Sequence, residues 1–106
     1  MSTDTVTQIA GLEPTYSARE AAALLGRSYS WLDQRLRRGE FVLPDGTSVQ
    51  ALRSPGGYRY FTIEMLQDIA ICSRNHHWFS WAKFKATLGE LAIAAHIDAG
   101  VDEMPS

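Results

Sequence analysis

Residues 17–41 read SAREAAALLGRSYSWLDQRLRRGEF, and this stretch decides the fold. It predicts two short helices joined by a tight turn. Ser17 is expected to be the N-cap of the first helix, and Glu20, three residues later, completes a capping box. Strong helix formers fill residues 18–25. Gly26 ends this helix, because glycine takes the left-handed position after a helix end without a steric cost.

The second helix is expected over residues 29–38, with Ser28 as its N-cap and Gly39 at its end. Leu32 and Leu36 lie four residues apart and share the face that packs on the first helix. The connection between the helices is only about three residues long, and so short a turn forces a steep crossing. That crossing is the geometry of a helix-turn-helix, although an unrelated helical hairpin has the same spacing.

A β-hairpin is predicted further along the chain, around the sequence RSPGGYRYF at residues 53–61. Residues 48–53 alternate in polarity and suit a strand, and residues 58–61 contain strong β formers. The turn between them carries two glycines, which makes the tip narrow. Arg53 and Arg59 stand on the two arms. A helix-turn-helix followed by a basic hairpin indicates a reader of duplex DNA.

Two further helices are expected after the hairpin. The first runs over residues 63–75 with Thr62 as its N-cap, and the second runs over residues 78–99. The second helix either packs back on its own domain or contacts another protein chain, and an exposed Trp78 or Trp81 would favour the contact. Its apolar stripe consists of Trp81, Phe84, Leu88, Leu91 and Ala95.

The charge of the chain is unevenly distributed around a formal net charge of −2. Residues 17–61 hold seven arginines against four acidic residues, a charge of +3, whereas residues 1–16 carry −2 and residues 86–106 carry −4. Charges are screened beyond about 8 Å at physiological salt, so the local charge governs docking on phosphates. The single cysteine excludes a disulfide within the chain. No signal peptide or membrane-spanning run is visible, so we expect a cytoplasmic protein with no membrane partner.

The run EAAALLGRSYSWLDQRLRRGEF resembles the winged helix-turn-helix of MerR-type regulators and of excisionases. The resemblance covers roughly residues 16–75 and includes the basic hairpin, which is the wing of those proteins. Three features depart from the family pattern. Arg27 stands where the family usually has a packing valine. Arg35 stands where Trp or Leu is common, and Trp31 supplies that bulk from a shifted position. The connection before the hairpin is long. The matching residues are Glu20, Ala21, Ala22, Leu24, Leu25, Gly26, Ser28, Leu32, Leu36, Arg37, Arg38, Gly39, Glu40 and Phe41, and in the hairpin Arg53, Gly56, Gly57, Tyr58, Arg59 and Phe61.

The resemblance implies a mainly α fold with a small β-hairpin, namely a winged helix-turn-helix plus an added C-terminal helix. The expected organisation is a flexible tail at residues 1–15, a winged helix-turn-helix DNA-binding domain at residues 16–77, the C-terminal helix at residues 78–99 and a second tail at residues 100–106. The acidic ends of the chain therefore lie outside the DNA-binding domain.

A helix-turn-helix reads DNA by placing the N-terminal part of its second helix in the major groove. There, Gln34 is suited to pair with adenine and an arginine with guanine, and the hydroxyls of Ser28 and Ser30 at the helix N-terminus suit a phosphate. In the wing, Arg53 and Arg59 are suited to the negative potential of the minor groove. The alternative is that these side chains are solvated, or that the hairpin arginines pair with Glu or Asp. The candidate DNA-binding residues are Arg19, Arg27, Ser28, Tyr29, Ser30, Gln34, Arg37, Arg38, Arg53, Tyr58 and Arg59.

No arrangement of residues typical of an enzyme is visible. In the absence of a nucleophile–base pair, a phosphate-binding loop or a metal motif, we expect no enzymatic activity, no cofactor and no metal site. Asp68, Cys72 and His76 share one helix face, but three ligands along a straight helix span about 12 Å, too far for one ion. Cys72 is better interpreted as a small buried hydrophobe, and a two-residue site shared with a partner chain is the alternative.

The function that the resemblance implies is that of an excisionase, a recombination directionality factor. Such a protein binds sites side by side along the duplex, bends the DNA and assists an integrase in excising a prophage. The implied partners are double-stranded DNA, further copies of the chain along it and an integrase, within the nucleoid of a bacterial host cell. A small MerR-like transcriptional regulator without an effector domain is the alternative. A protein-interaction module is a third possibility, which the arginine excess disfavours.

Overall fold

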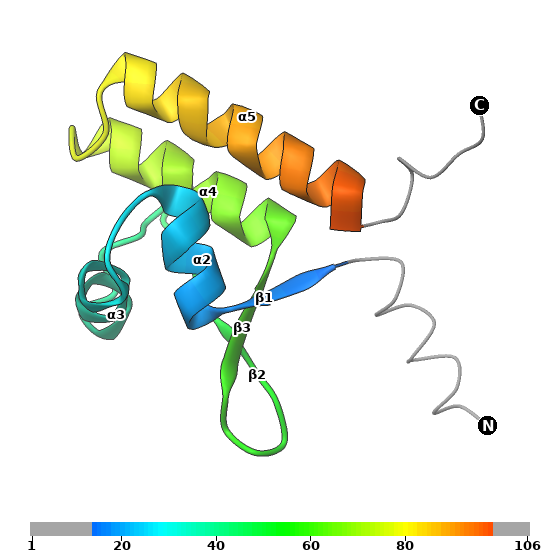
Figure 1. Ribbon diagram of the computed structural model, residues 1–106. Coiled ribbons are helices and arrows are strands. Elements are labelled where there is room, and N and C mark those ends of the chain that lie inside the picture. Colours follow the sequence, from blue (N-terminus) through cyan, green and yellow to red (C-terminus); the bar gives the residue numbers. More distant parts are fainter. Residues whose placement is uncertain (1–13, 99–106) are drawn as a thin grey trace, which may run out of the picture.

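The computed structural model describes residues 14–98 (Figure 1). This part of the chain forms four helices and a small three-stranded antiparallel sheet, so it is mostly helical, as predicted. None of these helices has the length and apolar character needed to cross a membrane. The helices are α2 (Ala18–Leu25), α3 (Tyr29–Arg37), α4 (Ile63–Asn75) and α5 (Trp81–Asp98), and the strands are β1 (Thr15–Ser17), β2 (Leu52–Arg53) and β3 (Arg59–Thr62).

The two short helices begin and end where their capping residues predict. The Ser17 hydroxyl accepts a hydrogen bond from the Glu20 amide at 3.1 Å, and the Glu20 carboxylate accepts one from the Ser17 amide at 2.8 Å. Gly26 follows α2 with φ +69°, in the left-handed region. The Ser28 hydroxyl then accepts from the amide of Trp31 at 3.1 Å and caps α3. Two satisfied N-caps on either side of one glycine fix the tight turn between the helices.

The sheet contains a strand that the sequence analysis placed in a flexible tail. Thr15 was expected to end that tail, but it opens β1, which pairs with β3 in the strand order β1–β3–β2. The pairing sets Tyr16 opposite Phe61, and both side chains are buried in the core. Burial of these two aromatic rings explains why the short β1 segment is ordered. The rest of the expected tail, residues 1–13, and the expected tail at residues 100–106 lie outside the described residues.

The predicted strand over residues 48–53 is wrong for most of its length. Only Leu52 and Arg53 pair with β3. Val49, in the predicted strand, instead contacts the segment that follows α3. Its amide donates to the Phe41 carbonyl at 2.8 Å, and its side chain is buried. The second arm of the hairpin is shifted by one residue from its predicted bounds and ends at Thr62. The hairpin is therefore short, and it projects away from the helices (Figure 1).

The helix predicted over residues 78–99 begins three residues late, at Trp81. His77 has φ +65°, and Phe79 inserts its ring into the core, so the chain is still turning at these positions. Beyond the turn, α5 runs beside α4 (Figure 1), and Leu91 is fully buried on the inner side of α5. The helix therefore packs back on its own domain, while Trp81 at its start is 58% exposed.

Candidate nucleic-acid interface

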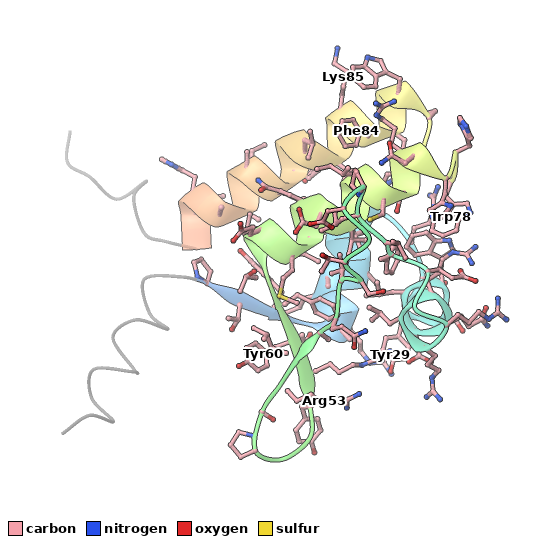
Figure 2. The ribbon with its side chains drawn as sticks, turned by 180° about the vertical axis from the view of Figure 1, so that it is seen from behind. Tyr29, Arg53, Tyr60, Trp78, Phe84 and Lys85 are labelled. Atoms are coloured by element: carbon pink, nitrogen blue, oxygen red, sulfur yellow. The ribbon has the colours of Figure 1, made fainter. Side chains whose placement is uncertain are left out.

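A groove of about 580 Å³ separates α3 from the β2–β3 hairpin, and we call it the arginine groove. Four arginines and one aspartate line it, an excess of three positive charges in a chain whose formal net charge is −2. Figure 2 shows Tyr29 and Arg53 at this groove, whereas Trp78 lies on a different side of α3 and Lys85 is on α5. The lining residues are Ser17, Ala18, Arg19, Tyr29, Asp33, Arg37, Arg53, Gly57, Tyr58 and Arg59.

The floor of the arginine groove is set by the first turns of α2 and α3. The tight turn at Gly26 brings these two helix starts to the same side of the molecule, next to the hairpin. The guanidinium of Arg19 lies 4.8 Å from the ring centroid of Tyr29, within the range of a cation–π contact. The Tyr29 hydroxyl in turn accepts a hydrogen bond from Arg59 Nη2 at 3.1 Å. A single tyrosine therefore links α2, α3 and the hairpin.

Asp33 is the centre of the charge network in the groove. Its Oδ1 accepts from Arg59 Nη2 at 2.6 Å, and its Oδ2 accepts from Arg37 Nε at 2.8 Å. The hydrogen bond from Arg59, together with that from Arg37, holds the pKa of the Asp33 carboxyl below its usual value, although partial desolvation opposes the shift. The carboxylate is only 17% exposed. Asp33 therefore stays ionised at neutral pH and ties the hairpin to α3.

The two arginines that pair with Asp33 differ in what they leave for a ligand. The Arg59 side chain is 14% exposed and lies between Asp33 and Tyr29. The Arg37 side chain is 75% exposed and contacts Asp33 through its Nε. Arg59, expected from the sequence to reach DNA, is thus placed as the link between hairpin and helix, while Arg37 projects outward.

The hairpin tip presents one arginine and one tyrosine. Arg53 Nη1 donates to the Gly57 carbonyl at 3.0 Å, which closes the tip of the hairpin. The Ser54 hydroxyl accepts from the Tyr58 amide at 3.2 Å and adds a second link across the turn. Tyr58 is 77% exposed, with its ring beside the backbone of Gly56. The tip is therefore a turn closed by two side-chain hydrogen bonds, and it exposes an aromatic ring to solvent.

The outer face of α3 carries the remaining candidates. Ser30 and Gln34 are exposed and lie on the side of α3 that points away from the core. Arg38, just beyond the helix, is also exposed, with Glu40 at 3.9 Å. Ser28 keeps its place at the helix N-terminus, but its hydroxyl oxygen is engaged as the cap. The structure therefore brings six of the sequence-predicted DNA-binding residues together at the arginine groove, whereas Ser28, Ser30, Gln34 and Arg38 are exposed outside its lining. The six are Arg19, Tyr29, Arg37, Arg53, Tyr58 and Arg59.

Arg27 lies outside the arginine groove, at a group of rings that we call the aromatic cluster. Its Nη2 donates to the Trp78 carbonyl at 3.0 Å, and its guanidinium lies 4.9 Å from the ring centroid of Phe79. Arg35, which stands where the resembled family commonly has Trp or Leu, also lies at this cluster. Its guanidinium is 4.2 Å from the ring centroid of Trp78 and donates a hydrogen bond to Glu40 at 2.8 Å. The two unexpected arginines thus contact the α4–α5 connection instead of facing the groove. The aromatic cluster consists of Trp31, Phe41, Trp78 and Phe79.

Asp33 is the residue of the arginine groove that the sequence analysis did not single out. Its spacing of four residues from Arg37 is the signal that predicts their ion pair. No local pattern predicts the pair with Arg59, which is 26 residues away along the chain.

Burial raises the pKa of two side chains on α4, Cys72 and Asp68. Cys72 is fully buried, and burial raises the pKa of its thiol. Burial, together with the nearby charge of Glu64, also raises the pKa of Asp68. Within residues 14–98, no group of three or more His, Cys, Asp and Glu residues is close enough to hold a metal ion.

Comparison with known proteins assigns the chain to one family. Residues 6–94 match the model of the family described as Domain of unknown function (DUF7229), which covers most of the chain. No curated protein and no solved structure matches. The chain belongs to the DUF7229 family.

Proposed function

We propose that this protein is a sequence-specific double-stranded DNA-binding module with a winged helix-turn-helix fold. In this proposal α2 and α3 are the helix-turn-helix, α3 enters the major groove, and the β2–β3 hairpin is the wing. The observation that carries the proposal is the arginine groove, which concentrates an excess of three positive charges between α3 and the hairpin. Phosphates are attracted to such a patch whatever the total charge of the chain, because screening limits the reach of the acidic residues elsewhere.

The dimensions of α3 support its role in the proposal. The helix has nine residues, so its axis is roughly 13.5 Å long at 1.5 Å per residue. The diameter of a helix with its side chains, about 10–12 Å, matches the width of the major groove, about 12 Å. Side chains from both ends of α3, from Ser30 to Arg37, are then within reach of the base edges or of the flanking phosphates.

The proposed contacts with DNA fall into two kinds, those that read bases and those that position the protein on the backbone. Gln34 and Arg37 lie on the exposed side of α3 and are the candidates for base contacts. Arg38 and the N-terminus of α3 suit phosphates. On the wing, Arg53 and the exposed ring of Tyr58 suit the backbone or the adjacent minor groove. Arg59 acts indirectly, by fixing the angle between the wing and α3 through Asp33.

For the biological role we propose an excisionase, which binds side by side along DNA, bends it and assists an integrase. The sequence resemblance supports this role. Footprinting on genomic DNA from the source of the chain separates it from a MerR-like regulator. Protection of adjacent sites in the arms of a recombination site supports the excisionase, and protection confined to a promoter supports the regulator.

The proposed DNA binding is tested by fluorescence anisotropy with a pool of labelled duplexes at several salt concentrations. We expect an affinity that falls linearly on logarithmic axes, with a slope of about −0.9 for each phosphate contacted. Arg38→Gln should weaken binding and reduce the slope by about one contact. Lys85→Gln is the matched control, because it removes one exposed positive charge from α5, remote from the groove (Figure 2). Absence of salt-dependent binding to any duplex, or an equal effect of the two substitutions, contradicts the proposal.

A further inference from the structure

We propose, on the basis of the DNA binding proposed above, that Arg37 reads a guanine and that Asp33 is its positioning residue. The pairing of these two side chains is observed: Arg37 Nε donates to Asp33 Oδ2 at 2.8 Å. They lie four residues apart on α3, which puts them on the same face, one turn from each other. The carboxylate is itself fixed, since its other oxygen is held by Arg59 at 2.6 Å.

The atom used by Asp33 determines what Arg37 offers to DNA. A guanidinium has five N–H donors in a rigid planar fork. With Nε engaged, the Nη1 and Nη2 groups form the free end of the side chain, which is 75% exposed. That end-on pair of donors matches the O6 and N7 acceptors of guanine in the major groove. Holding one end of the side chain also reduces the rotamer freedom that is lost on binding.

The other arginines of the groove lack this arrangement. Arg59 is largely buried between Asp33 and Tyr29. Arg53 donates to the backbone of the hairpin tip at Gly57, and Arg19 lies against the ring of Tyr29. Arg37 is thus the exposed arginine of the arginine groove that a carboxylate aligns.

The carboxylate also favours a base over a phosphate as the partner of Arg37. An approaching phosphate is repelled by the negative charge of Asp33, which sits directly against the guanidinium. Guanine presents neutral acceptors and does not meet this repulsion. Asp33 therefore lowers the affinity of this part of the surface for DNA backbone in general while it directs Arg37 to a base edge.

The test begins with selection of binding sites from a randomised duplex library by the purified full chain. In the selected duplex, each guanine is then replaced in turn by 7-deazaguanine, which lacks the N7 acceptor but keeps its base pairing and its phosphate. We expect one replacement to weaken wild-type binding by about tenfold. The Arg37→Met variant should bind the modified and unmodified duplexes alike, because methionine has no N–H donor for the guanine O6 and N7 acceptors.

Two further variants separate the proposed base contact of Arg37 from the proposed positioning role of Asp33. Arg38→Met is the matched control, because Arg38 is an adjacent exposed arginine, 3.9 Å from its nearest carboxylate partner. It should bind every duplex more weakly but keep the full sensitivity to 7-deazaguanine. Asp33→Asn replaces one of the two oxygens that accept from Arg59 and Arg37 by an NH2 donor, and it removes the negative charge. It should therefore lose that sensitivity and bind DNA with a steeper salt dependence. Loss of stability alone changes neither of these ratios. Their change therefore identifies positioning.

The outcomes distinguish the inference from the function on which it rests. If wild-type protein binds no duplex in a salt-dependent manner, the proposed function fails and the guanine contact fails with it. If it binds but no 7-deazaguanine replacement matters, or if Arg37→Met keeps the tenfold sensitivity, the guanine contact alone is overturned. If Asp33→Asn leaves both the sensitivity and the salt dependence unchanged, Asp33 is not the positioning residue.

Discussion

Helix α3 is held on its two sides by different kinds of interaction. Toward the hairpin, Asp33 makes ion pairs with Arg37 and Arg59 in the arginine groove. On the other side, Trp31 packs in the aromatic cluster, with Arg35 stacked on Trp78. Salt screens ion pairs and acid neutralises their carboxylates, whereas packed rings have no carboxylate to titrate. We infer from this comparison that the aromatic cluster fixes the position of α3. The ion pairs of Asp33 then set the position of the hairpin relative to α3.

The largest expected effect comes from emptying the aromatic cluster. Phe41 is fully buried and contacts both Trp31 and Trp78, so Phe41→Ala should lower the free energy of unfolding by about 3–5 kcal/mol. Urea denaturation measures it. Tyr58→Ala removes an aromatic ring of similar size from the exposed hairpin tip and should leave stability nearly unchanged. Equal losses in the two variants would show that the cluster is not the side that fixes α3.

The next effect concerns the turn between α2 and α3, at the edge of the aromatic cluster. Gly26 has φ +69°, and a Cβ there would collide with the Nζ of Lys83, which lies 5.1 Å from the ring centroid of Phe79. Gly26→Ala should cost about 1–2 kcal/mol of stability, since an L residue resists the left-handed region. Gly89→Ala is the opposite case, because Gly89 is helical and faces open space, and it should stabilise by about 0.5–1 kcal/mol. Thermal unfolding of the two variants gives the signs.

Acid should weaken the hairpin side of α3 selectively. Because the Arg59 and Arg37 hydrogen bonds lower the folded pKa of Asp33, its pairing stabilises the protein fully above the unfolded pKa of about 3.9. This contribution is lost as the pH falls through the lower folded pKa. The difference in melting temperature between wild type and Asp33→Asn should therefore be largest near pH 7 and vanish in strong acid.

Asp68→Asn is the control with the opposite sign. Burial raises the folded pKa of Asp68, so its ionised form destabilises the protein at neutral pH and this cost disappears as the pH falls. The Asn variant should be the more stable protein near pH 7. A pH-independent difference for Asp33→Asn would contradict the role given to its charge.

The smallest effect is expected from neutralising Arg35. Its guanidinium stacks on Trp78, and its buried Nε has no hydrogen-bond partner among the described residues. Arg35→Met keeps an unbranched chain in the aromatic cluster and removes a charge whose desolvation offsets its ion pair. The free energy of unfolding in urea should change by less than about 1 kcal/mol. A loss of several kcal/mol would mean that the cluster side, too, depends on charge.

Local chemistry explains what the sequence could predict and what it could not. The caps at Ser17, Ser28 and Thr62 depend on neighbouring residues and were predicted correctly. Strand β1 was not predicted, because three residues are too few to show an alternating pattern of polar and apolar side chains. The strand forms only by pairing with β3. For the candidate site, the sequence located the arginines but not their partners. The environments of Arg27 and Arg59 depend on residues 51 and 26 positions away.

The central claim is that DNA docks on the arginine groove, between α3 and the hairpin. The most direct measurement is the titration of isotopically labelled protein with its selected duplex, followed through backbone amide chemical shifts. The account predicts the largest shifts at residues 29–38 and 53–59, with the exposed side of α5 around Lys85 unchanged. Shifts centred on α5, or shifts absent from both segments of the groove at saturating duplex, would contradict it.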